Sequence, residues 1–341
     1  SDFPTSTNAY DESRNNEEDM FISKFDSNLT NLLASTFLGG SNSDYINSIA
    51  IDSDGNIYIT GKTTSSNFPM TTSAYDFSYN GGGDAFISKL NGELTSLLAS
   101  TYLGGTDFYY DDYGHSITID SSGSIYISGY SNSSYFPMDT ETYDTSYNGS
   151  KDIFVSKFSG DLTSLLASTY LGGANSDYGH SISIGPSGIL YVTGYTNSSD
   201  FPTTIDAYDT SYNGNDDVFV SKLSGDLTSL LASTYLGGSD SDHANSITID
   251  ASGNVCVAGY TYSSDFPTTT EAYDISYNDS EDVFLSKLSG DLTTLLASTY
   301  LGGSNYDNAK SIAIDSNGNV YVTGYANSSG FPTTIDAYDT S

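Results

Sequence analysis

Short apolar runs separated by polar turns recur along this chain in a fixed order. In one stretch they cover residues 181–184, 190–194, 218–223 and 230–236. Each run is rich in β-branched and aromatic residues and is bounded by Gly, Asn, Asp or Ser, which is typical of β-strands. No segment keeps an apolar period of 3.6 residues, and only the Ser-Leu-Leu-Ala segments leave room for a short helical turn. The pattern predicts an all-β fold.

The whole set of runs repeats with a period of 65 residues and one copy of 68. A Leu-Gly-Gly landmark closes the last run of each copy, at residues 38–40, 103–105, 171–173, 236–238 and 301–303. A unit of this size cannot bury its apolar face alone, so neighbouring copies must supply the rest of the core. We therefore expect residues 1–341 to form a single domain with one small sheet per repeat.

Tight turns such as Asp52–Asn56 join the first two strands of each copy as hairpins, with Gly where a positive φ is needed. Because several strands are apolar on both faces, we expect small sheets that pack face to face around an axis. The sequence begins and ends inside a repeat, as a piece of a longer protein would.

One phenylalanine stands at the same register in the third strand of each continuous blade. We expect these rings to be buried between blades. They are Phe86, Phe154, Phe219 and Phe284.

Three blocks recur in order through the copies: Asp-Val-Phe-Val-Ser-Lys-Leu, Leu-Leu-Ala-Ser-Thr-Tyr-Leu-Gly-Gly, and a hairpin block ending in Ser-Asp-Phe-Pro-Thr-Thr. Together they closely resemble the SBBP β-propeller repeat over essentially the whole chain. Residues 49–59 are also similar to the strand pair of NHL-repeat propellers. The resemblance implies a β-propeller of four-stranded antiparallel blades, with the Ser-Ile-Ala-Ile strand innermost. In that strand order the chain starts with two outer strands and finishes with two inner ones, so we predict five blades closed by pairing of the N- and C-terminal strands. It also implies a secreted or cell-surface location, and it implies no particular reaction.

The charge of the chain excludes several partners. With 43 acidic and 9 basic residues, the net charge is -34. Such a chain repels nucleic acid phosphates and anionic lipids, and it favours cations. No apolar run approaches the ~18 residues of a membrane span, so we expect no direct membrane insertion. The single cysteine, Cys256, is expected to be a small packed residue.

An aspartate precedes each predicted inner strand in one register. These residues are Asp44, Asp112, Asp177, Asp242 and Asp307. A ring of carboxylates at a channel mouth suits the hard oxygen coordination of Ca²⁺. The alternative is that each aspartate bonds to backbone amides and ties one blade to the next. We expect no required cofactor, and at most weak Ca²⁺ binding beside general charge screening.

The long loops carry a repeated Ala-Tyr-Asp-X-Ser-Tyr-Asn motif, whose rings, carboxylate and amides suit sugar binding. The alternative is that these groups fold each loop back onto its own blade. The tyrosines are Tyr75, Tyr79, Tyr143, Tyr147, Tyr208, Tyr212, Tyr273 and Tyr277. Glycosylation acceptors, which chance would also supply in so Asn- and Ser-rich a chain, are Asn28, Asn132, Asn148, Asn197, Asn278 and Asn327.

Catalysis by a propeller needs unlike carboxylates at unique positions, one of them with a raised pKa. The central positions look nearly the same in every copy, and none of the common catalytic motifs is present. We therefore expect a non-enzymatic, structural or adhesive module of a cell envelope or appendage. The alternative is a lectin-like propeller with repeated sites on the long-loop face. The expected partners are protein subunits of a surface assembly or cell-surface glycans, and nucleic acid is not expected.

Overall fold

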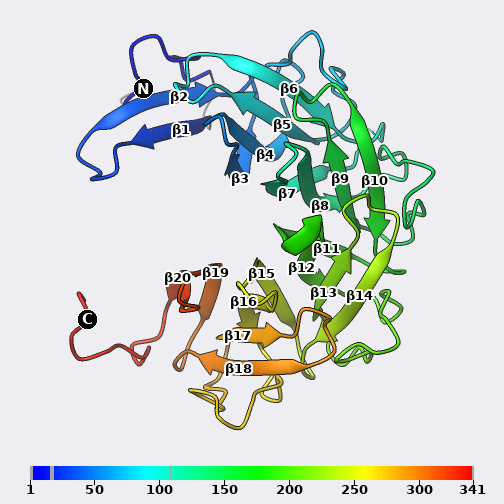
Figure 1. Ribbon diagram of the computed structural model, residues 1–341, viewed down its shortest axis with the longest axis vertical. Helices are drawn as coiled ribbons and strands as arrows, with labels where there is room; N and C mark the ends of the chain where they lie inside the picture. Colours follow the sequence, from blue (N-terminus) through cyan, green and yellow to red (C-terminus); the bar gives the residue numbers. More distant parts are fainter. Residues whose placement is uncertain (1–2, 16–18, 108, 340–341) are drawn as a thin grey trace. The chain divides into compact units, whose positions relative to one another are not determined.

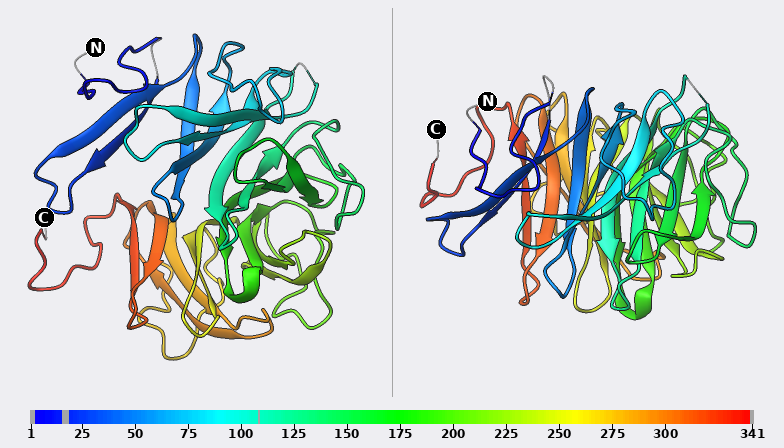
Figure 2. Two further views of the ribbon diagram at one scale, coloured as in Figure 1. Left: turned by 45° about the horizontal axis from the view of Figure 1, so that its top comes forward. Right: turned by 90° about the horizontal axis from the view of Figure 1, so that it is seen from above.

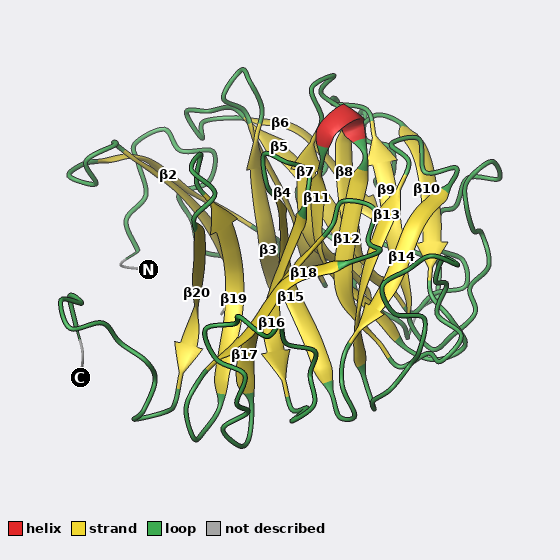
Figure 3. Ribbon diagram, turned by 60° about the horizontal axis from the view of Figure 1, so that its bottom comes forward, coloured by secondary structure: helices red, strands yellow, loops and turns green. Residues whose placement is uncertain are grey.

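The computed structural model describes residues 3–15, 19–107 and 109–339. Strands and loops make up nearly all of this part of the chain (Figure 3). The helical content of the described residues is one 3-10 turn, η1, at Pro186–Gly188. The Ser-Leu-Leu-Ala segments, where the sequence left room for a short helical turn, lead into strands and do not form helix. The all-β prediction is confirmed.

The strands follow one another as the repeat predicts. The first ten are β1 (Met20–Phe25), β2 (Leu32–Leu38), β3 (Asp44–Ile51), β4 (Ile57–Thr63), β5 (Asp84–Leu90), β6 (Leu97–Leu103), β7 (Asp112–Ile119), β8 (Ile125–Ser131), β9 (Asp152–Phe158) and β10 (Leu165–Leu171). The next ten are β11 (Asp177–Ile184), β12 (Leu190–Thr196), β13 (Asp217–Leu223), β14 (Leu230–Leu236), β15 (Asp242–Ile249), β16 (Val255–Thr261), β17 (Asp282–Leu288), β18 (Leu295–Leu301), β19 (Asp307–Ile314) and β20 (Val320–Ala326).

Each complete repeat forms one four-stranded antiparallel sheet, here called a blade. The blades are β3-β4-β5-β6, β7-β8-β9-β10, β11-β12-β13-β14 and β15-β16-β17-β18, with neighbours in chain order (Figure 1). The fifth repeat is divided between the ends of the chain, as β1-β2 and β19-β20. This arrangement confirms the predicted five-repeat fold of four-stranded blades with one blade split. The pairing of the two half-blades with each other stays a prediction.

The chain divides into two compact units. The first comprises Ser1–Tyr147 and Lys151–Leu171, and the second comprises Asn148–Ser150 and Gly172–Ser341. In the first unit β3 packs beside β7, and the β1-β2 hairpin is the separate dark blue ribbon in Figure 2. In the second unit β11 packs beside β15, and β15 beside β19. The prediction of one domain over residues 1–341 stays a prediction.

The apolar core lies between consecutive sheets. One cluster in the second unit combines Val218 and Val220 of β13 with Val255, Val257 and Phe284 of the following blade. Because both faces of the third strands are covered, nearly every residue of β13 is buried. Each repeat therefore completes the core of the next, as a unit too small to fold alone requires.

The four predicted phenylalanines are fully buried. The ring of Phe284 packs on Phe266, the phenylalanine of the Phe-Pro pair in the same blade, at 4.6 Å between ring centroids. The same pairing joins Phe86 to Phe68 at 4.6 Å. The third-strand position of these rings is therefore as predicted.

The short turns between the third and fourth strands are held by the preceding blade. Leu162 and Leu292 have positive φ values of 57° and 61°, although both are fully buried leucines. The Tyr75 N–H donates to the Leu162 carbonyl at 3.1 Å, and the Tyr208 N–H donates to the Leu292 carbonyl at 2.8 Å. Burial of a leucine side chain offsets the strain of this backbone conformation, on the order of 1–3 kcal/mol. The long loop of one blade thus clamps the next blade.

A bulge shapes the start of each inner strand. In β15 the register with β16 shifts between Ala244 and Ser246. Opposite the bulge, a Cβ on Gly259 would lie 1.9 Å from the His243 carbonyl oxygen, so only glycine fits there. The bulge re-aims the side chains at the beginning of the strand, which is where the candidate site lies.

Candidate functional site

The predicted aspartate register stands at the first residue of each inner strand, and all five side chains are buried. Each carboxylate accepts a hydrogen bond from the N–H of the second glycine of the preceding Leu-Gly-Gly. Examples are the bonds from Gly173 to Asp177 and from Gly238 to Asp242, both at 2.7 Å. A serine hydroxyl from the next strand end adds a bond in several blades, such as Ser263 to Asp242 at 3.0 Å. These contacts are those of the backbone-tie interpretation. The Ca²⁺ interpretation stays untested.

Burial raises the pKa of Asp44 and Asp177 above the usual value for aspartate. For Asp112 and Asp242, burial raises the pKa to about 7. Another buried carboxylate also acts on each of these groups, namely Asp84 on Asp112 and Asp217 on Asp242. A second carboxylate therefore lies close to each inner-strand aspartate.

This second register opens the third strand of each blade, and we did not expect it to form part of a site. Its members include Asp84, Asp217 and Asp282, all fully buried. Burial raises the pKa of Asp84 to about 7 and that of Asp217 and Asp282 to about 6. The signal in the sequence is a column of aspartates followed by Ala, Ile or Val and then Phe. Because buried aspartates are rare unless paired, such a column in a strand is informative.

The loop tyrosines divide into two groups. In one group the hydroxyl donates to a backbone carbonyl nearby, as Tyr79 does to Gly82 at 2.8 Å and Tyr147 to Asn132 at 3.0 Å. Tyr212 and Tyr277 donate in the same way to Asn215 and Ser280. These four hydroxyls are used inside the fold, as the loop-folding alternative expects.

Two tyrosines of the other group, Tyr75 and Tyr208, belong to the clamp between blades. The ring of Tyr75 packs edge-on against Phe158 of the next blade at 5.6 Å. Tyr143 and Tyr208 are half-buried, whereas Tyr273 is 74% exposed. A role for any of these tyrosines in ligand binding stays a prediction.

The predicted glycosylation acceptors all lie outside the core. Asn28, Asn148 and Asn327 are exposed, and Asn132, Asn197 and Asn278 are half-buried. Their modification stays a prediction that intact mass spectrometry of the native protein would test.

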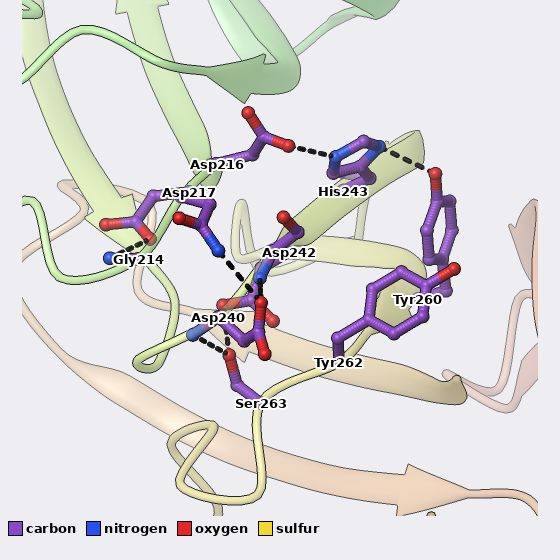
Figure 4. A network of polar contacts seen from close by, with 12 residues as sticks. Gly214, Asp216, Asp217, Asp240, Asp242, His243, Tyr260, Tyr262 and Ser263 are labelled. Carbon is purple, nitrogen blue, oxygen red and sulfur yellow. Dashed lines mark hydrogen bonds and ion pairs between the residues drawn. The ribbon is translucent and has the colours of Figure 1, made fainter. Parts of the chain in front are cut away.

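Residues that differ between copies meet at the start of the inner strands in the second unit (Figure 4). Asp216 immediately precedes β13, and its Oδ2 lies 3.0 Å from Nε2 of His243 in the next blade. The hydroxyl of Tyr260 lies 2.6 Å from the other ring nitrogen of His243. The ring of Tyr195 stacks on the imidazole at 3.8 Å and 6°. We call Tyr195, Asp216, His243, Tyr260, Tyr262 and Glu281 the His243 cluster.

Glu281 holds the same place in the following blade as Asp216 does in its own. It is buried and accepts the Tyr262 hydroxyl at 2.8 Å. The Asn308 amide donates to its other oxygen at 2.7 Å. The register that contains Asp216 and Glu281 is Gly83 and Lys151 in the earlier copies, so the charge at this point changes from blade to blade.

The phenols of this cluster are donors at neutral pH. Burial, with the nearby Glu281 carboxylate, raises the pKa of Tyr260 to about 12. Burial and a hydrogen bond to Glu281 also raise the pKa of Tyr262. In the tautomer with the proton on Nε2, directed at Asp216, Nδ1 of His243 accepts a hydrogen bond from the Tyr260 hydroxyl. The network is then a satisfied chain of donors and acceptors that fixes the imidazole between Tyr195 and Tyr260.

The first unit has different residues in the corresponding places. Lys62 pairs with Asp111 at 2.8 Å and donates to the Tyr113 hydroxyl at 3.0 Å. Tyr113 stacks on Tyr130 at 4.9 Å, and the Lys151 ammonium lies 5.2 Å from the centre of the Tyr130 ring. The inner-strand ends are therefore less alike than we expected from the repeated apolar positions. A comparison of the copies at the positions of residues 45, 62 and 83 of the first blade would have shown these differences in the sequence.

The repeated lysines bond to turns of their own or the next blade. Lys222 donates to the Gly290 carbonyl of the next blade at 2.7 Å, where the Tyr191 hydroxyl also donates at 3.1 Å. Lys287 pairs with Asp250 at 2.7 Å. These groups belong to the scaffold and not to a basic binding site.

In the described part of the chain, no group of three or more His, Cys, Asp or Glu side chains is placed to hold a metal ion together. Its helical content also includes nothing long and apolar enough to cross a membrane.

Comparison with known proteins places the chain in a family. No curated protein matches the sequence. Among solved structures, a match is found to the Dos1 propeller (11% identity, 89% of this chain and 69% of that chain, TM-score 0.42). Another is a protein of unknown function from Bacteroides caccae (9% identity, 82% and 89%, TM-score 0.30), and a third is the computationally designed Ika8 protein (8% identity, 84% and 74%, TM-score 0.34).

The model of the SBBP β-propeller repeat matches five times, just over half of the chain in all. The matched residues are 35–69, 100–137, 168–202, 233–267 and 298–332. Each match begins in an outermost strand and ends at the Phe-Pro pair of the next repeat. The five matches follow the strand order of the described blades, and the chain therefore belongs to the SBBP β-propeller repeat family.

Proposed function

We propose that this protein is a non-catalytic interaction module with a structural or adhesive role at a cell envelope or appendage. One observation carries the proposal: the repeated polar groups are used within the fold, while the residues that differ gather at the inner-strand ends. The repeated aspartates, lysines and loop tyrosines bond to their own or the next blade. A scaffold built in this way leaves the His243 cluster and its first-unit counterpart to distinguish one partner from another.

The Asp216–His243–Tyr260 chain resembles a catalytic relay, but its chemistry favours binding. A tyrosine nucleophile or base needs a lowered pKa so that the phenolate forms near neutral pH. Here burial raises the pKa of Tyr260 to about 12. Tyr260 and His243 therefore present a fixed donor and acceptor pattern, and we propose that the protein is not an enzyme.

The location and partners follow from charge and family. A net charge of -34 disfavours nucleic acid and anionic membranes, and the exposed sequons at Asn28, Asn148 and Asn327 suit a secreted chain. We propose an extracellular or cell-surface protein whose partners are subunits of a surface assembly.

A second candidate is carbohydrate binding at the long loops of the first unit. Tyr109 and Tyr135 are 87% and 67% exposed, and they come from the β6–β7 and β8–β9 loops. The Ser133 hydroxyl donates to Asp107 at 2.9 Å and joins these two loops. Exposed tyrosines beside a carboxylate are the groups with which proteins stack on and bond to sugars.

The test compares binding to isolated envelope proteins with binding to a glycan array, each with and without Ca²⁺. The variants are Asp216→Asn with His243→Ala, and Tyr109→Ala with Tyr135→Ala. The proposed function predicts binding to envelope protein that the first variant weakens at least tenfold and the second leaves intact. Glycan binding that only the second variant removes would support the lectin candidate instead. Turnover of a glycan or peptide that Asp216→Asn alone abolishes would overturn the non-catalytic proposal.

A further inference from the structure

Buried carboxylates face each other in pairs where one blade meets the next. Asp282 opens β17, and Asp307 opens β19 of the following half-blade; both are fully buried. A methyl group built on Gly302 would stand 2.3 Å from Asp282 Oδ1 and 3.2 Å from Asp307 Oδ2. The two carboxylates therefore flank one small space, which the glycine leaves open.

The same arrangement recurs at the other junctions inside each unit. A methyl group on Gly237 would stand 2.7 Å from Asp217 Oδ1 and 2.9 Å from Asp242 Oδ2. The corresponding distances at Gly104 are 2.6 Å to Asp84 Oδ1 and 3.0 Å to Asp112 Oδ2. At Gly39 the pair is Asp19 and Asp44, at 3.0 and 3.1 Å.

In two of these pairs, the third-strand aspartate has an oxygen without a hydrogen-bond partner among the described residues. In Asp84 and Asp282, Oδ2 accepts a backbone N–H from the preceding turn at 2.9 and 2.8 Å. Oδ1 of the same two residues is buried without a hydrogen-bond partner among the described residues. These oxygens are the ones that point at the glycine and at the second carboxylate.

The charged groups that act on the third-strand aspartates of these pairs are acidic. The ion pairs found in the described ranges involve other carboxylates, such as Asp111 and Asp250. Further acidic groups lie near each pair: Asp76 and Asp111 near Asp84, Asp209 and Asp216 near Asp217, and Asp274 and Asp279 near Asp282. Two like charges buried together cost several kcal/mol unless a proton or a cation compensates them.

The chemistry around the pairs is that of a hard cation. Every group described above that faces the open space is an oxygen. Asp84 Oδ1 also lies beside a second glycine, Gly81, on which a methyl group would stand 3.1 Å from Asp84 Oδ1, 3.2 Å from Tyr110 O and 3.4 Å from Asp107 O. Carboxylate and carbonyl oxygens are the ligands that Ca²⁺ prefers.

We propose that each of these blade junctions binds a divalent cation, Ca²⁺ by its ligand chemistry, between a third-strand and an inner-strand aspartate. The cation binds the oxygens that lack a hydrogen-bond partner, neutralises the charge of the pair and holds neighbouring blades together. The site thus lies inside each junction and includes Asp84, Asp217 and Asp282, which the sequence-based ring of inner-strand aspartates left out. The competing occupant is a proton shared within each pair.

The experiment measures Ca²⁺ binding to the full chain by calorimetry and thermal unfolding, at about pH 8 and about pH 5. Binding only to the folded state raises the unfolding midpoint in proportion to the logarithm of the Ca²⁺ concentration. We expect a large shift at pH 8 and little at pH 5, because protons then compete for the carboxylates. Na⁺ at equal ionic strength should not reproduce the shift.

Asp282→Asn is the diagnostic variant because it keeps the size of the side chain. It should lower the number of bound Ca²⁺ ions by one, while raising the midpoint in Ca²⁺-free buffer by removing the repulsion from Asp307. The matched control, Asp206→Asn, removes an exposed charge and should change neither quantity. An unchanged Ca²⁺ stoichiometry in Asp282→Asn would overturn the proposal. So would a response to Ca²⁺ that Na⁺ equals, or proton uptake without any saturable Ca²⁺ binding.

Discussion

Replacement of Phe284 by alanine tests whether the blades share one core. The ring is fully buried, and it belongs to a cluster with Val218 of the preceding blade and Val255 of its own. It faces Tyr300 across the β17–β18 ladder and stacks on Phe266 at 4.6 Å. Removing a side chain packed on all sides loses its transfer free energy and leaves a cavity, so Phe284→Ala should destabilise the second unit by about 3–5 kcal/mol.

Chemical denaturation monitored by tyrosine fluorescence and circular dichroism measures this loss. Phe77→Ala is the matched control, because Phe77 is 70% exposed, and it should change the free energy of unfolding by less than about 0.5 kcal/mol. A Phe266→Ala variant and the double variant complete a cycle whose coupling energy should be about 0.5–1.5 kcal/mol for the stacked pair. A loss below about 1 kcal/mol in Phe284→Ala would refute the interblade core.

Three further predictions follow from buried groups. Burial raises the folded-state pKa of Asp84 and Asp242 to about 7, so the folded chain holds protons that the unfolded chain releases near 4. The unfolding midpoint in Ca²⁺-free buffer should therefore fall as the pH rises from about 5 to 8. A midpoint that does not change with pH would contradict the burial of these carboxylates. Cys256 is buried with a pKa raised to about 11, so a thiol reagent should label it only after unfolding, and labelling of the native protein would show an open β16. The Tyr208→Pro substitution removes the N–H that donates to the Leu292 carbonyl. It should lower the free energy of unfolding by about 1–3 kcal/mol, whereas Tyr208→Phe, which keeps the N–H, should not. Chemical denaturation of both variants measures the difference.

Much of the fold could be predicted because each strand carries its own signal. The run expected at 230–236 is β14 as observed, and the run expected at 218–223 lacks only Asp217 at its start. The strand expected at 181–184 begins earlier, at Asp177, because the aspartate and the bulge after it pair with β12 before the apolar residues begin. Apolar periodicity locates the buried part of a strand and misses its polar beginning.

The candidate site could be predicted only in part. The inner-strand aspartates are visible as a column, and their backbone bonds follow from their place beside Leu-Gly-Gly. The contact between Asp216 and His243 joins residues of different blades, and nothing local in either segment indicates it. The role of Asp282 was hidden for a different reason: an aspartate beside another acid, Glu281, looks like surface charge, and only the structure shows that both are buried.

We propose that recognition resides in the residues that differ between otherwise equivalent blades. A consensus variant tests it most directly: Asp216→Gly with His243→Tyr gives this junction the residues found at Gly83 and Tyr113. The measurement is the binding isotherm of the variant and the wild type on the isolated envelope partner, with both unfolding midpoints recorded. We expect the consensus variant to lose at least tenfold in affinity while its unfolding midpoint stays nearly unchanged. Wild-type affinity in the consensus variant would contradict the claim.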